Sequence, residues 1–142
     1  MKVVGIVPAR MGSSRFPGKP LAKIHGMPMI GHVYNRCKMS KLLDEVFIAT
    51  CDHEIMAYIE SIGGKAIMTK DTHERCTDRT TEALKKIEIG TSKIIDIIVM
   101  IQGDEPMVTP KMLDESVQPM LIDDSIQVIN FIFDFNKLII FN

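Results

Sequence analysis

Several features that mark particular classes of protein are scarce in this sequence. No apolar run approaches the roughly 20 residues that a membrane-spanning helix needs. The formal net charge is −1, so no broad electrostatic field favours nucleic acid or a membrane surface. We therefore expect neither a nucleic acid nor a membrane among the partners of this chain.

Cysteine is also scarce. Cys37, Cys51 and Cys76 leave an odd count without a C-x-x-C spacing, and Met1-Lys2 leads straight into an apolar run, with no targeting segment. Reduced thiols in a cytoplasmic protein are the expected state. Cys51-Asp52-His53 lacks distant partners at metal spacing, so we interpret it as incidental. The 142 residues, 46% hydrophobic and 25% charged, suit one domain with a real core.

The most distinctive stretch is Pro8–Pro20, which follows the apolar run Val3–Val7. It contains two glycines, three prolines, two serines and three cations within thirteen residues. Glycine and proline favour a fixed, non-helical backbone with open amides. Such a loop at the carboxyl end of a strand is suited to holding a phosphate chain. The alternative is a plain solvated loop, and the crowding of cations and glycines at one strand end argues against it.

Two common phosphate motifs are absent from this stretch. The spacings G-x-x-x-x-G-K-[ST] and G-x-G-x-x-G do not occur. The residues alone therefore predict a phosphate site of unassigned type. Arg10 and Lys19 are its best ligands, because arginine offers a planar fork and lysine a mobile point charge. Backbone amides near Gly12, Ser13 and Ser14 would assist them.

Apolar runs alternate with segments of helical periodicity along the chain. The predicted strands cover 2–8, 45–50, 65–68, 94–101 and 125–133, and the predicted helices cover 28–39, 52–62, 77–87 and 110–121. The strands are continuous apolar runs, which indicates an α/β fold with a mainly parallel sheet and helices on both faces. Ligands of such sheets bind outside the carboxyl ends of the strands, where residues 8–20, 50–53 and 102–106 lie.

The motifs of the chain resemble the cytidylyltransferases that activate acidic sugars, in particular the 3-deoxy-manno-octulosonate (Kdo) cytidylyltransferase family. The matching segments are Pro8–Arg10, Ser14–Leu21, Pro28–Ile30, His32–Val33, Ala49–Thr50, Asp52–Glu54, Thr77–Arg79 and Gln102–Met107. The resemblance runs from Val3 to about Asn130. It implies a Rossmann-like nucleotide-diphospho-sugar transferase fold. It also implies a reaction of CTP with Kdo that gives CMP-Kdo and pyrophosphate, for lipopolysaccharide synthesis in the cytoplasm.

The resemblance assigns roles to residues of the first loop. It implies that Arg10 and Lys19 bind the triphosphate and act in catalysis. It also places Ala9 in the nucleotide site, beside the amides of residues 12–14. Arg15 is expected either in this site or in a salt bridge that holds the loop.

Asp104 follows the most apolar predicted strand and a glycine, so its carboxylate would lie at the carboxyl edge of the sheet. Mg²⁺ is the implied cofactor, and the resemblance assigns Asp104 to it, in keeping with the preference of Mg²⁺ for carboxylates with retained water. The alternative is an ordinary turn aspartate, which Gly103 and Pro106 also fit. We expect Glu105 to be structural. Gln102, whose amide can donate and accept, lies near the nucleotide by resemblance.

Thr77-Asp78-Arg79 begins a predicted helix. Its residue types favour a helix cap followed by a surface arginine, whereas the resemblance puts Thr77 and Arg79 at the nucleotide base. The family commonly has Ser-Gly before this threonine, where the chain has Arg75-Cys76. The loss of that glycine alters how closely the backbone can approach the base.

The resemblance fades in the last twelve residues, which are biased to Phe, Ile and Asn. We expect a nucleotide-binding α/β domain over 1–130 and an aberrant or truncated tail over 131–142, with an authentic edge strand as the alternative. The sugar-binding half, a second metal-binding aspartate and the segment that forms a homodimer in the family have no counterpart before Asn142. We therefore expect a fragment that binds nucleotide weakly and turns over poorly or not at all.

Two other interpretations stay open. The chain is related to an enzyme for another acidic sugar, such as an acylneuraminate, or it is a remnant that serves only as a nucleotide-binding or oligomerising module.

Overall fold

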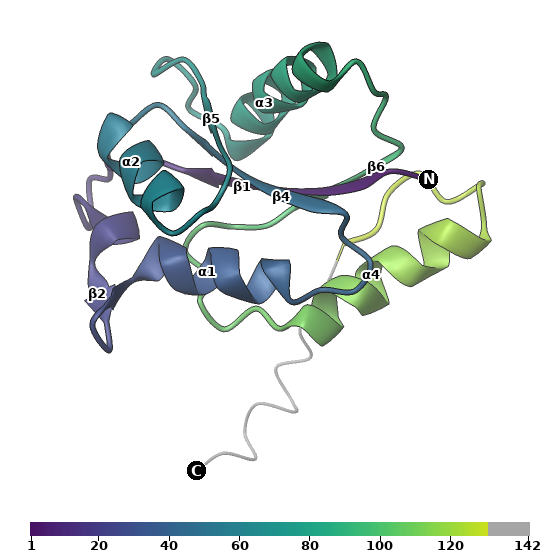
Figure 1. Cartoon of the computed structure of the whole chain (residues 1–142), viewed down its shortest axis with the longest axis horizontal. Helices are drawn as coiled ribbons and strands as arrows, with labels where there is room; N and C mark the ends of the chain where they lie inside the picture. Colours follow the sequence, from purple (N-terminus) through teal and green to yellow (C-terminus); the bar gives the residue numbers. More distant parts are fainter. Residues whose placement is uncertain (131–142) are drawn as a thin grey trace.

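Four parallel strands form the main sheet of the computed structural model, which describes residues 1–130 (Figure 1). The strands are β1 (Val3–Ala9), β4 (Glu45–Thr50), β5 (Ala66–Met68) and β6 (Ile97–Met100). Their order across the sheet is β5-β4-β1-β6, and each neighbouring pair is parallel. The mainly parallel sheet predicted from the apolar runs is confirmed.

Helices cover both faces of this sheet (Figure 1). The helices α1 (Met29–Lys38), α2 (His53–Ser61) and α4 (Pro110–Ile122) share one core with β1 and β4, whereas α3 (Cys76–Thr91) packs on the opposite face. All seven residues of β1 are buried as a result. A strand covered on both faces has no solvated side, which explains why its sequence is a continuous apolar run.

The strand order places a topological switch point beside β1. From β1 the chain adds β4 and then β5 on one side, and it returns to the other side of β1 to form β6. The loops that follow β1 and β6 therefore diverge from adjacent strand ends. In open parallel sheets, the crevice at such a point is the usual place for a ligand.

The segment between β1 and α1 contains three small elements. A 3-10 turn, η1 (Lys19–Leu21), leads into an antiparallel hairpin of β2 (Lys23–Ile24) and β3 (Met27–Pro28). The hairpin turns at Gly26, which has a positive φ of 80°. Pro28 lies directly before α1, because its fixed φ suits the start of a helix.

Two predicted elements have boundaries that differ from those in the structure. The predicted strand 94–101 is formed only as β6, because β1 begins at Val3 and its register with β6 begins at the Val3–Ile97 pair. Ile94 is accordingly 81% exposed. The predicted helix 77–87 begins earlier and ends later, at Thr91, after which Ser92 adopts a left-handed conformation.

The last predicted strand, 125–133, is not formed in the part of this range that the structure describes. Residues 125–130 form neither helix nor strand, and residues 131–133 lie outside the described residues, as does the predicted tail 131–142. The predicted helix 110–121 is confirmed as α4. Pro110 opens this helix, and the Oγ1 of Thr109 accepts a hydrogen bond from the amide of Met112 at 3.2 Å.

None of the helices within 1–130 has the length and apolar character to cross a bilayer.

The first residue of β4, Glu45, holds two lysines at the amino end of the sheet. Its carboxylate lies 2.6 Å from Lys65 Nζ and 2.9 Å from Lys2 Nζ. Lys65, followed by Lys2, lowers the pKa of Glu45 from 4.5 to about 2. A carboxyl whose pKa is lower in the folded state stabilises the fold above its unfolded pKa. That contribution is lost as the pH falls from 4.5 towards 2.

We expect the Glu45→Gln variant to lose this pH dependence. Because the side chains are partly exposed, the variant should be less stable than the wild type by about 1 kcal/mol at neutral pH, with the difference vanishing near pH 2. Urea unfolding at a series of pH values measures this difference. Parallel stability curves for the two proteins would show that the ion pairs contribute nothing.

Candidate functional site

A cleft of about 480 Å³ lies at the carboxyl ends of β1 and β6, at the switch point. Its walls come from the loop after β1, from η1, from the loop after β6 and from the first residue of α3. Eight of the ten predicted site residues line it. They are Ala9, Arg10, Gly12, Ser13, Ser14, Lys19, Gln102 and Asp104. Thr77 and Arg79 are not among the lining residues.

The loop after β1 is held in shape by its own backbone. The amide of Gly18 donates to the carbonyl of Met11 at 2.9 Å, and Gly18 has φ 74°, a conformation that glycine adopts without strain. The Oγ of Ser13 accepts from the amide of Phe16 at 3.2 Å. Within residues 1–130, the amides of residues 12–14 donate no hydrogen bond. They are available to an anion in the cleft.

Asp52 anchors the same loop from the end of β4. Asp52 occupies the N-cap position of α2, but its side chain does not cap that helix. Its Oδ2 instead accepts from the amide of Met11 at 2.8 Å. A helix does begin directly after Asp52, but the Asp52 carboxylate accepts from an amide that is distant in the sequence.

Lys19 and Asp104 meet across the cleft. The distance between Lys19 Nζ and Asp104 Oδ2 is 3.0 Å, and the two side chains are 41% and 53% exposed. Gly103 makes this approach possible, because a Cβ at that position would lie 2.8 Å from the carbonyl oxygen of Pro8. The close packing of Gly103 on β1 thus brings the Asp104 carboxylate next to the segment that carries Arg10, Arg15 and Lys19.

Two further cations face the cleft without a carboxylate partner. Arg10 and Arg15 line it and are exposed, and neither takes part in the ion pairs found among residues 1–130. The loop-holding salt bridge considered for Arg15 is therefore absent from the described part of the chain. The local charge of the cleft is positive, although that of the whole chain is −1.

Cys76 is a lining residue that the sequence did not single out. Its Sγ lies 3.6 Å from the Oε1 of Gln102, and both side chains are exposed. The predicted helix start at Thr77 or Asp78 left this residue in a loop, whereas α3 begins with it. The signal available was the Arg75-Cys76 departure from the family pattern. Phe16 and Met29 also line the cleft.

The three cysteines are free thiols. Burial raises the pKa of Cys37 to about 12, so this thiol stays protonated in the core. Residues 1–130 hold no group of three or more His, Cys, Asp or Glu side chains arranged for a metal ion.

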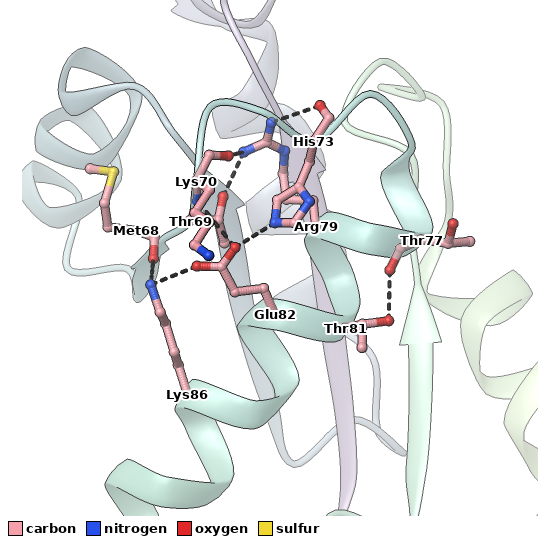
Figure 2. A network of polar contacts seen from close by, with 9 residues as sticks. All are labelled: Met68, Thr69, Lys70, His73, Thr77, Arg79, Thr81, Glu82 and Lys86. Carbon is pink, nitrogen blue, oxygen red and sulfur yellow. Dashed lines mark hydrogen bonds and ion pairs between the residues drawn. The ribbon is translucent and has the colours of Figure 1, made fainter.

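Arg79 is buried beside the cleft wall, away from solvent. It is 2% exposed, and its guanidinium donates to Thr69 Oγ1 at 2.5 Å, to the Lys70 carbonyl at 3.2 Å and to the His73 carbonyl at 3.5 Å (Figure 2). The surface position favoured by its residue type is wrong. In this structure the guanidinium holds the loop over residues 69–73, and its expected place at the nucleotide base stays a prediction.

Glu82 completes this network on the next turn of α3. Its carboxylate binds Lys86 at 2.8 Å, His73 and the amide of Lys70 (Figure 2). Lys86 is the main cause that lowers the pKa of Glu82 to about 2. The carbonyl of Thr77 accepts from Thr81 within the helix. The start of α3 and the preceding loop are therefore one braced unit, which carries Cys76 at the cleft.

Comparison with known proteins extends the likeness seen in the motifs. Residues 4–130 match the family model for cytidylyltransferases. A 3-deoxy-manno-octulosonate cytidylyltransferase of Geobacter metallireducens is 44% identical over 128 residues, which are 90% of this chain and 48% of that protein. An 8-amino-3,8-dideoxy-manno-octulosonate cytidylyltransferase of a Shewanella strain is 44% identical over 117 residues, or 82% of this chain and 46% of the relative.

A solved structure shares the fold. The structure of a CMP:2-keto-3-deoxy-manno-octonic acid synthetase complexed with CTP has a TM-score of 0.82 and 44% sequence identity, covering 88% of this chain and 49% of the other. The nucleotidyltransferase fold expected from the resemblance is confirmed. The chain spans about half the length of the curated relatives it matches.

Proposed function

This chain belongs to the cytidylyltransferase family, and from that premise we propose that its cleft binds the triphosphate of CTP and supports transfer of CMP to an acidic sugar. One observation carries the proposal: Arg10, Lys19 and the unpaired amides of residues 12–14 surround a single cleft whose rim holds Asp104. The bound CTP in the similar structure and the names of the relatives support the choice of nucleotide.

The proposed reaction is a substitution at the α-phosphorus of CTP. A hydroxyl oxygen of the sugar bonds to that phosphorus and loses its proton to solvent, while the bond from the phosphorus to the pyrophosphate oxygen breaks and pyrophosphate leaves. Positioning and charge stabilisation supply most of the catalysis in such a step. Arg10 and Lys19 would stabilise the charge of the β- and γ-phosphates, while the loop amides orient them. Ala9 and Gln102 would contact the rest of the nucleotide.

The cleft offers one carboxylate, that of Asp104, to a Mg²⁺ ion. Asp104 is a single, partly exposed carboxylate, and residues 1–130 offer no cluster of ligands that would enclose the ion. Mg²⁺ is commonly held by one or two carboxylates together with substrate phosphates, and Asp104 suits that arrangement. When bound, the ion would neutralise phosphate charge.

The sugar is proposed from the relatives. Kdo is the first candidate, and its 8-amino-3,8-dideoxy analogue is the second, because the Shewanella relative named for that sugar is as similar to this chain as the Geobacter relative named for Kdo. An acylneuraminate stays a prediction. The role in lipopolysaccharide synthesis and the cytoplasmic location belong to the same proposal.

Calorimetric titration of the 142-residue chain with CTP and Mg²⁺ tests nucleotide binding. We expect saturable heat with CTP and weaker binding of CMP, which lacks the phosphates that Arg10 and Lys19 would hold. UTP and ATP serve as controls for recognition of the base. Absence of heat at millimolar CTP would contradict the proposal, and equal affinity for all three triphosphates would leave only a general polyphosphate site.

A further inference from the structure

The ion pair between Lys19 and Asp104 occupies the groups that the proposed ligands need. It is the one ion pair among residues 1–130 that joins two walls of the cleft, with 3.0 Å between Lys19 Nζ and Asp104 Oδ2. Lys19 is the first residue of η1, and Asp104 lies in the loop after β6. Both side chains are partly exposed, so each can leave the other without breaking the core.

A polyphosphate that enters the cleft alone meets an obstacle. To reach Lys19 it must separate the ammonium group from Asp104, which leaves an uncompensated carboxylate beside the phosphates. Like charges at such short distance repel each other even through water. Arg10 and Arg15 are free to bind the anion, but they do not neutralise Asp104 in the described structure.

A divalent cation removes this obstacle, because it takes the carboxylate while the phosphates take the ammonium. We propose that the Lys19–Asp104 pair is a latch whose exchange of partners makes the binding of polyphosphate and of a divalent cation mutually favourable. The inference rests on the proposed function, since it concerns the same cleft. The coupling is reciprocal: the cation strengthens binding of the nucleotide by the factor by which the nucleotide strengthens binding of the cation.

The variant Asp104→Asn opens the latch while keeping the shape of the side chain. The measurement is the Kd of CTP by calorimetry, with chelator present and again with saturating Mg²⁺. Without metal, we expect the variant to bind CTP about two- to five-fold more tightly than the wild type, as suits an exposed ion pair. We also expect Mg²⁺ to improve the affinity of the variant less than that of the wild type.

Two comparisons separate the latch from simple loss of a negative charge. Glu105→Gln removes the adjacent carboxylate, which is exposed and lines a different groove, and it should leave the metal-free affinity unchanged. In the Lys19→Met background, Asp104→Asn should tighten metal-free binding less than it does in the wild type, because only the repulsion by the carboxylate is removed and no ammonium group remains to be released. An undiminished gain in that background, or no gain in the single variant, would overturn the latch.

Inorganic triphosphate is the second probe, and it distinguishes the latch from the nucleotide assignment. If triphosphate shows the coupling but CTP binds no better than triphosphate, the latch stands and the proposed function fails. If CTP binds in preference to other nucleotides without the effect of Asp104→Asn, the function stands and the latch fails. If neither anion binds with or without Mg²⁺, both are overturned.

Discussion

Replacing Lys19 with methionine is expected to weaken the binding of CTP by about 10- to 100-fold in the presence of Mg²⁺. The variant keeps most of the length and the apolar stem of the Lys19 side chain, which is 41% exposed, but loses the ammonium group at the cleft. A hydrogen bond to a charged group contributes roughly 1.5–3 kcal/mol, and each 1.4 kcal/mol corresponds to about a factor of ten in affinity. Calorimetric titration of the two proteins measures the change.

Lys23→Met provides the matched control for this variant. Lys23 lies four residues further along, in β2, where it is exposed and does not line the cleft. Both substitutions remove one positive charge from the chain, so an effect of overall charge would appear equally in both. Equal affinities for Lys19→Met and Lys23→Met would place the phosphates elsewhere.

The second large effect is expected from Gly103→Ala, with a loss of about 1–3 kcal/mol in the free energy of unfolding. The added Cβ would lie 2.8 Å from the carbonyl oxygen of Pro8 and 3.3 Å from the Cβ of Ala9. Both contacts belong to β1, the most buried strand, which cannot give way. The loop after β6 must therefore move outward and take Asp104 with it.

Urea unfolding measures the loss, and Gly12→Ala is its control. Gly12 lines the same cleft, but a Cβ there would meet nothing within 4 Å, so the expected change is within about 0.5 kcal/mol. Identical unfolding midpoints for wild type and Gly103→Ala would show that this close approach costs nothing. We also expect Gly103→Ala, unlike Gly12→Ala, to weaken the response of CTP binding to Mg²⁺.

The sequence predicts those parts of the fold that depend on local pattern. Continuous apolar runs locate β1 and β4, and the helical spacing of Ile30, Val33 and Tyr34 locates α1. The parallel arrangement follows from burial on both faces, and it brings the loops after β1 and β6 to one edge. Eight of the ten predicted site residues meet there for this reason. Their roles towards a ligand stay predictions.

The errors concern residues whose positions depend on distant partners. The start of β6 is set by where β1 begins, which the apolar residues Ile94 and Ile95 do not reveal. Asp52 has the position of a helix cap, but the amide of Met11, forty-one residues earlier, binds its carboxylate. Arg79 is drawn inward by carbonyls of a loop that carries no periodic pattern. Local propensity cannot rank such competing partners.

The tether from Asp52 to Met11 has a consequence for the thermodynamics of recognition. Together with the bond from Gly18 to Met11, it fixes both ends of the glycine-rich segment in the unliganded chain. A flexible segment would lose conformational entropy when it binds a ligand, whereas this segment has already lost that entropy when the chain folds. We therefore expect the proposed binding of an anion here to require little ordering of the backbone, so that its heat-capacity change reflects desolvation.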